Sequence, residues 1–316
     1  TNKSKRDSRQ HHRSTVFDLL SCGLTRIGLN LLCVLLFSLV VTAPVAANED
    51  LMKLGGEAYE RGDYAAAVRI FAEASVRLTA ELGERHPSTL RSGNNLAKSL
   101  IDTGRPDEAL PLIQRVVALR TEVLGPRSPD TMESIDLLAW ALCHSGRLAE
   151  CTTQSERLLA LRMEVQGEDH KETLDAMNNL ALAYYLAGRF SEQIELGEKA
   201  LQKQIVLLGE RQIVTIDTMS TLAWGYWSMG RFGEHLRLAE RVLQLCSELF
   251  GESNPRSMRA LDSLANGYSS LGRFEDSLAL QKRALERLMA ISGEDTLEAS
   301  AAIVNLARTF WAVGRH

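Results

Sequence analysis

The sequence predicts an all-α protein, a right-handed α-solenoid in which tandem helix pairs stack on one another. Two series of glycines, each with an interval of 42 residues, support this fold, and no insertion or deletion breaks their register. Apolar residues before each turn glycine also recur at helical spacing. Because one helix pair cannot bury its apolar face alone, neighbouring pairs must stack. The first series is Gly62, Gly104, Gly146, Gly188, Gly230, Gly272 and Gly314, and the second is Gly83, Gly125, Gly167, Gly209, Gly251 and Gly293.

Each unit of 42 residues contains two expected helices. The first helix carries apolar residues 11, 8, 7 and 4 positions before its turn glycine, and the second helix ends at a glycine of the second series. Six pairs are expected from about residue 51, with a seventh first helix over about 299–313. One first-helix stripe is Met177, Leu180, Ala181 and Tyr184, and one second-helix stripe is Leu238, Val242, Leu243 and Phe250.

Prolines mark the start of several first helices. Pro87, Pro129 and Pro255 suit the first helical turn, where no amide donor is needed. Ser128 and Asn254 precede two of them and are expected to act as N-caps. The loop after Gly209 departs from this pattern, since it has Gln212, Ile213 and Val214 where the proline is expected.

Residues 1–47 differ from the rest of the chain. They hold six basic and two acidic residues, whereas the remainder holds 30 basic and 38 acidic residues. An uncharged apolar run from Ile27 to Ala43 leads to the small residues Val45 and Ala47, which is typical of a secretory signal cleaved after Ala47. An uncleaved membrane anchor is the alternative. Both hypotheses place residues 48–316 outside the cytoplasm, in the periplasm or the extracellular space.

The chain shows no signal for catalysis. Its net charge of −4 gives no indication of a nucleic-acid partner, and it lacks the phosphate-binding, zinc-protease and nucleophile-elbow motifs. We therefore expect a non-enzyme without a cofactor or metal. The histidines after Ala47, such as His86 and His170, are interpreted as loop and cap residues. Cys143 and Cys151 flank a helix–helix turn, so a disulfide between them is conceivable, but repeat phase points them to different faces. We therefore expect Cys143, Cys151 and Cys246 to be three buried or semi-buried thiols.

The repeated pattern L-A-x-x-Y-x-x-x-G-R, followed by an apolar helix and L-G-x-x-x-P, resembles the 42-residue tetratricopeptide repeats of kinesin light chains and their bacterial relatives. The resemblance covers roughly residues 51–316. It implies the stacked helix pairs already inferred and a concave groove in which peptides dock. It is weak for function, because one fold hosts many partners.

In that family, residues 13, 10, 6 and 3 positions before the turn glycine resemble the lining of the groove. All four tryptophans fall in these positions and avoid the apolar stripe, and Trp224 and Trp227 should adjoin. Packing between adjacent first helices is the alternative for the tryptophans, and a solvated helix face is the alternative for the polar residues. The candidate groove residues are Asn94, Lys98, Asp136, Trp140, Asn178, Tyr185, Trp224, Trp227, Asn266 and Trp311.

Three functions are compatible with these features. The first is a non-catalytic scaffold that binds a peptide segment of a protein partner, with no nucleic acid and with membrane contact only through an uncleaved N-terminal segment. The second is the sensor or regulatory arm of a larger enzyme of protease or kinase type, whose effector domain lies beyond His316. The third is a glycan binder that uses Trp224 and Trp227 as stacking platforms.

Overall fold

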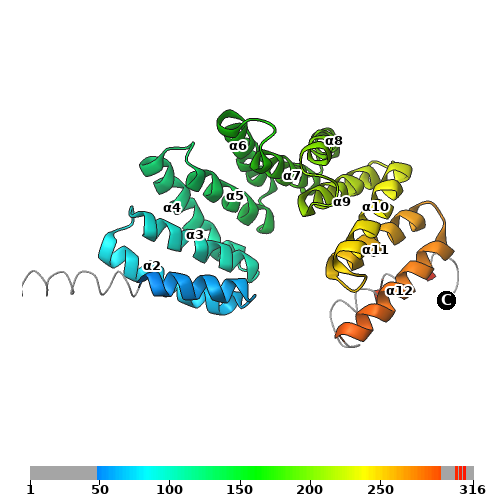
Figure 1. Cartoon of the computed structure of the whole chain (residues 1–316), viewed down its shortest axis with the longest axis horizontal. Helices are drawn as coiled ribbons and strands as arrows, with labels where there is room; N and C mark the ends of the chain where they lie inside the picture. Colours follow the sequence, from blue (N-terminus) through cyan, green and yellow to red (C-terminus); the bar gives the residue numbers. More distant parts are fainter. Residues whose placement is uncertain (1–47, 293–302, 305, 308, 311–316) are drawn as a thin grey trace, which may run out of the picture. The chain divides into compact units, whose positions relative to one another are not determined.

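The computed structural model describes residues 48–292 together with 303, 304, 306, 307, 309 and 310, and every element in them is a helix (Figure 1). The expected N-terminal signal or anchor and Trp311 lie outside these residues. Residues 48–60 form the first helix. The helices that follow are α2 (Tyr64–Leu82), α3 (Pro87–Asp102), α4 (Pro106–Leu124), α5 (Pro129–His144), α6 (Leu148–Gln166), α7 (Lys171–Leu186), α8 (Phe190–Leu207), α9 (Ile213–Ser228), α10 (Phe232–Phe250), α11 (Pro255–Ser270) and α12 (Phe274–Ser292).

The chain divides into two compact units, Thr1–Ser99 and Leu100–His316, and the boundary falls within α3. In the first unit, residues 48–60 pack against α2 around Ala58, Ala67 and Phe71. In the second unit, each of α6, α8 and α10 contacts the first helix of its own repeat and the first helix of the next. The first helices α5, α7, α9 and α11 also contact one another in order. This consecutive packing of helix pairs confirms the predicted α-solenoid.

The predicted apolar stripe forms the core of the second unit. In α5, Ile135, Leu138, Ala139 and Leu142 are all buried, and the equivalent residues of α9 are buried as well. The alanine seven positions before the glycine lets the paired second helix approach closely, since Ala139, Ala181, Ala223 and Ala265 are each at most 4% exposed. The residues of the predicted apolar stripe are therefore the ones that pack between the helices.

The turn glycines adopt positive φ, as the sequence predicts. Gly188 has a φ of 73°, and the amide of Arg189 donates to the carbonyl oxygen of Tyr184 at 2.8 Å, which closes α7. Gly167 ends α6 with a φ of 85°. A side chain at either position would strain the backbone.

The arginine after each turn glycine has a structural role that the sequence pattern alone did not explain. The guanidinium of Arg189 lies 4.2 Å from the ring centroid of Tyr184 and donates to Glu192 at 3.0 Å and to Glu156 at 3.2 Å. The Tyr184 hydroxyl donates to Glu156 at 3.0 Å. Because Glu156 belongs to α6, this group ties the turn after α7 to the preceding second helix. The ring contact and the tyrosine bond to a glutamate of the preceding second helix recur at Tyr226 with Arg231 and at Tyr268 with Arg273.

The helix caps agree only in part with the sequence. Asn254 accepts a hydrogen bond from the amide of Arg256 at 2.9 Å, which confirms its role as a cap. Ser128 makes no side-chain cap hydrogen bond, so that expectation was wrong. The Nδ1 atoms of His86 and His170 accept from the amides two residues later, which confirms these histidines as cap residues.

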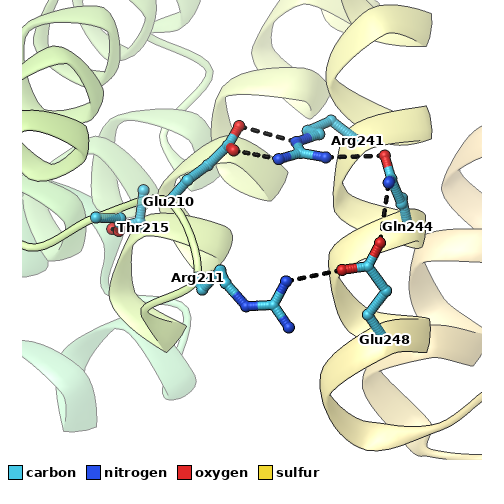
Figure 2. Close-up of polar contacts among 7 residues, drawn as sticks. Glu210, Arg211, Thr215, Arg241, Gln244 and Glu248 are labelled. Atoms are coloured by element: carbon cyan, nitrogen blue, oxygen red, sulfur yellow. Dashed lines mark hydrogen bonds and ion pairs between the residues drawn. The ribbon is translucent and has the colours of Figure 1, made fainter.

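The loop that lacks the proline, between α8 and α9, is held by polar contacts to α10 (Figure 2). Both carboxylate oxygens of Glu210 accept from Arg241, whose guanidinium also donates to Gln244 at 2.8 Å. Arg211 donates to Glu248 at 2.8 Å, and the side-chain amide of Gln244 donates to Glu248 at 2.9 Å. A connected network of this kind fixes a loop more firmly than an isolated surface ion pair, which is worth about 0–1 kcal/mol.

Two sets of equivalent buried positions join consecutive repeats. The residue five positions after each first-series glycine lies between helices, and the residue five positions before the next glycine is always small. An alanine Cβ at Gly225 would lie 1.6 Å from Oε1 of Gln193, and one at Gly267 would lie 2.6 Å from the His235 ring. Glycine therefore occurs where the partner side chain is long. The register pairs are Ala109 with Ala141, Cys151 with Ala183, Gln193 with Gly225, and His235 with Gly267.

Candidate functional site

The candidate site lies on what we call the first-helix face. It comprises the residues 13, 10, 6 and 3 positions before the turn glycines of α5, α7, α9 and α11. These helices belong to one compact unit and contact one another in order. The face consists of Glu133, Asp136, Trp140, Cys143, Asp175, Asn178, Leu182, Tyr185, Asp217, Ser220, Trp224, Trp227, Arg259, Asp262, Asn266 and Ser269.

The three described tryptophans keep a large part of their surface accessible. Trp140 is 41% exposed and Trp227 is 36% exposed, whereas Trp224 is half-buried. Trp224 and Trp227 adjoin as expected, with ring centroids 5.8 Å apart at an interplanar angle of 79°. The indole nitrogen of Trp227 donates to the Ser270 hydroxyl at 2.8 Å. The pair thus presents an edge-to-face aromatic surface that spans α9 and reaches α11.

Several polar candidates already bond to a neighbouring helix. Asp136 accepts from Nδ2 of Asn179 at 3.2 Å, which joins α5 to α7. The side-chain oxygen Oδ1 of Asn178 accepts from the Thr218 hydroxyl at 3.1 Å, which joins α7 to α9. These bonds hold consecutive first helices at fixed spacing.

The other candidates lie in varied surroundings. Tyr185 packs its ring 5.7 Å from that of Phe190, and Asn266 is half-buried on α11. In the first unit, Asn94 is only 2% exposed, so it lies inside the unit and not open on its surface. Lys98 is exposed, and its Nζ lies 4.5 Å from the Tyr59 ring centroid. The role of each of these residues in binding stays a prediction.

A cavity of about 130 Å³ opens beside Trp224, between α9, α10 and α11. Its polar wall contains Asp217, which forms an ion pair with Arg256, and Arg259. Its apolar wall reaches down to α10. The remaining lining residues are Ile216, Ser220, Ala223, Ala239, Val242, Cys246, Ala260 and Ser263. The cavity therefore combines an apolar interior with a charged and aromatic edge, which is the composition of many ligand sites.

Carboxylates dominate the charge of the first-helix face. It carries Glu133, Asp136, Asp175, Asp217 and Asp262, with Arg259 as its one basic residue. Burial raises the pKa of Asp136, Asp175 and Asp262. Arg162 and the hydrogen bond from Asn179 lower the pKa of Asp136, while Lys171 and Arg162 lower that of Asp175, but burial has the larger effect in both.

The expectation of three separate thiols was wrong. Cys143 and Cys151 form a disulfide, with their Cα atoms 5.3 Å apart. The tight turn around Gly146 brings the end of α5 against the start of α6, so residues that differ in repeat phase still meet across it. Cys246 is a free, buried thiol, and burial raises its pKa.

Two further findings concern metal binding and membrane spanning. Within the described residues, no cluster of three His, Cys, Asp or Glu side chains is arranged to hold a metal ion. None of the described helices is long and apolar enough to span a bilayer.

The cavity and the buried His235 were not found from the sequence. The two ring nitrogens of His235 lie 2.9 Å from the carbonyl oxygen of Ala223 and 3.0 Å from that of Ser263. Its ring also lies 5.8 Å from that of Trp224. The available signal was the repeat position: His235 stands where the other repeats have alanine, cysteine, glutamine or serine, and Gly267 stands opposite it.

Comparisons with known proteins agree with this geometry. Two family models, both described as tetratricopeptide repeat, match the chain: one over residues 137–204 and 226–290, the other over 51–88 and 89–130. No curated protein matches the sequence closely enough to serve as a relative.

Solved structures share the fold. The repeats described as a kinesin light chain from Podosopora anserina are 25% identical, with a TM-score of 0.56, and cover 66% of this chain and 98% of that one. BtubC from P. vanneervenii is 21% identical, with a TM-score of 0.59, over 72% of this chain and 91% of that one. A Rap protein, solved with Competence and Sporulation Factor, is 11% identical, with a TM-score of 0.55, over 82% and 74% of the two chains.

Proposed function

Because the chain belongs to the tetratricopeptide repeat family, we propose that it is a non-catalytic scaffold that binds an extended peptide segment of a protein partner along the first-helix face. Stacked helix pairs commonly form extended binding surfaces. Tryptophan is enriched at binding hot spots because it offers a large contact area and a polar edge.

One observation carries this proposal: the aromatic pair Trp224 and Trp227 lies on the predicted face, partly exposed, beside the cavity between α9 and α11. A residue needed only for packing between first helices would be covered by its neighbours, whereas Trp227 is 36% exposed. The adjoining cavity offers a place for a side chain of the ligand. This combination of aromatic surface and cavity favours recognition of a peptide.

We also propose that the scaffold works outside the cytoplasm, in the periplasm or the extracellular space. The basic flank, apolar run and small residues before Asn48 support export. The Cys143–Cys151 disulfide supports it independently, because structural disulfides persist mainly in oxidising compartments. The N-terminal sequence of the protein purified from its source tests this proposal. A mature chain that begins at Asn48 agrees with cleavage, and a reduced protein recovered from the cytoplasm contradicts it.

The binding proposal is tested by capturing partners from an extract of that compartment with the full chain and with a Trp224→Ala/Trp227→Ala variant. We expect the variant to lose at least tenfold in captured partner while its circular dichroism is unchanged. A Val206→Ala/Leu207→Ala variant is the matched control, because it removes exposed apolar side chains from α8, a second helix. Equal capture by all three proteins would show that the tryptophans are structural.

A further inference from the structure

The cavity beside Trp224 selects the size of the side chain that can enter it. Its volume of about 130 Å³ is close to that of protein cavities of about 150 Å³ that accept one benzene molecule. A branched aliphatic group fits a space of this volume. Its inner lining of Ile216, Val242 and Ala260 is apolar. An aliphatic side chain in the cavity would therefore replace water against apolar atoms, which is favourable.

The charges of the first-helix face select the other side chains of the ligand. Arg256 pairs with Asp217, and Arg120 lies 3.6 Å from Glu133. Among the described residues, Asp175 and Asp262 form no ion pair within 4 Å, and Asp136 has only the amide of Asn179. Arg162 acts on Asp136, and Arg162 and Lys171 act on Asp175, only from beyond ion-pair distance. A cationic ligand side chain placed directly beside these partly buried carboxylates would therefore be favoured. Arg259 is the single opposing charge on this face, and it lies at the cavity.

The helix spacing sets the distance between the two features. Asp136 bonds across the junction of α5 and α7, and the cavity lies at the junction of α9 and α11. These junctions are two helix spacings apart, or about 16–20 Å at the usual interaxial distance of 8–10 Å. An extended peptide advances about 3.3 Å per residue. About five or six residues therefore separate side chains that reach both features.

We propose that the ligand is a basic extended peptide that inserts an aliphatic side chain into the α9–α11 cavity and places a lysine or arginine, about six residues away, against Asp136 and Asp175. This inference rests on the proposed function and specifies the chemistry of its partner. The carboxylates select the basic residue, and the cavity fixes where the peptide sits.

The experiment measures binding of labelled peptide pools to the full 316-residue chain by fluorescence anisotropy. The basic pool has leucine and lysine separated by five varied small residues, and the acidic pool has glutamate in place of lysine. A third pool has only two residues between leucine and lysine. We expect the basic pool to bind at least tenfold more tightly than either of the others, with an affinity that falls as salt is added.

Two variants of the protein sharpen the measurement. Asp136→Asn/Asp175→Asn should lower the affinity for the basic pool about tenfold, while leaving the circular dichroism unchanged. Glu195→Gln/Glu286→Gln removes the same charge from exposed positions on α8 and α12 and should bind like the wild type. If both variants weaken binding equally, the effect is one of net charge, and the assignment to Asp136 and Asp175 is wrong.

The outcomes separate this inference from the function on which it rests. Tighter binding of the acidic pool would overturn the basic-peptide inference and leave the peptide-binding scaffold in place. Failure of every pool to bind would overturn the inference, and the capture experiment with the tryptophan variant would then decide the proposed function separately. Preference for the short spacing would show that the ligand does not use the cavity and the carboxylates together.

Discussion

The junction between α7 and α9 and the junction between α9 and α11 use the same registers but form different surfaces. At the first, Gln193 donates to the carbonyl oxygen of Thr221 at 3.1 Å, and α7 packs closely along α9. At the second, the two ring nitrogens of His235 lie within hydrogen-bond distance of carbonyl oxygens on α9 and α11, and these helices contact each other less. The cavity lies at this second junction. The cavity thus occurs at the junction where the buried His235 ring lies between two first helices. The length of the repeat is the same at both junctions.

The largest expected effect comes from removing the His235 ring. His235→Ala would remove the ring from between α9 and α11 and leave an empty space in the core, so we expect a loss of about 2–4 kcal/mol in the free energy of unfolding. Gln193→Ala should cost less, because Gln193 makes one hydrogen bond, of 3.1 Å, and its Oε1 is already unpartnered. Urea denaturation of both variants measures the difference. An equal loss would show that the two junctions are energetically alike.

In the preceding repeat, the equivalent position carries a covalent bond between α5 and α6. Cys151 holds the position of Gln193 and His235, and it is bonded to Cys143 across a loop of nine residues. In the chain-entropy description, closing such a loop stabilises the fold by about 2.5 kcal/mol. We therefore expect a reductant to lower the melting temperature of the wild type and to leave that of Cys143→Ala/Cys151→Ala unchanged. Equal sensitivity of both proteins would assign the effect to other cysteines.

The glycine partners of the long side chains give a smaller effect that can be reversed. Gly225→Ala places a methyl group against Gln193, so it should cost about 1–3 kcal/mol, although alanine favours a helix. Adding Gln193→Ala recreates the alanine pair found at Ala109 and Ala141 and should restore most of the loss. Gly233→Ala is the matched control, because nothing lies within 4 Å of its Cβ, and it should be neutral or stabilising by about 0.5 kcal/mol. A destabilised control or an unrescued double variant would contradict the pairing.

The repeat period was sufficient to predict the helix pairs, their turns and their core stripe, because these depend on short-range geometry that each repeat restates. The tryptophan pair was also placed correctly, since i and i+3 on one helix must adjoin. The cavity and the Cys143–Cys151 bond could not be predicted in this way. Both depend on residues from different helices, and the repeat phase gives the direction of a side chain on its own helix but not its distance from a neighbour.

The smallest effect concerns the tyrosines that each lie under an arginine. Tyr226 is more deeply buried than Tyr184 or Tyr268, and burial together with the hydrogen bond to Glu198 at 2.6 Å raises its pKa to about 12. A raised pKa means that the folded state favours the neutral phenol. This contribution to stability is fully present below pH 10 and is lost as the pH rises toward 12.

Absorbance at 295 nm should therefore show Tyr226 ionising late, as a component that is absent from Tyr226→Phe. Glu198→Gln should move that component to lower pH, because it removes the carboxylate that holds the hydroxyl proton. If Tyr226→Phe instead removed absorbance that develops near pH 10, the phenol would be open to solvent, and the burial of Tyr226 against α8 would be contradicted.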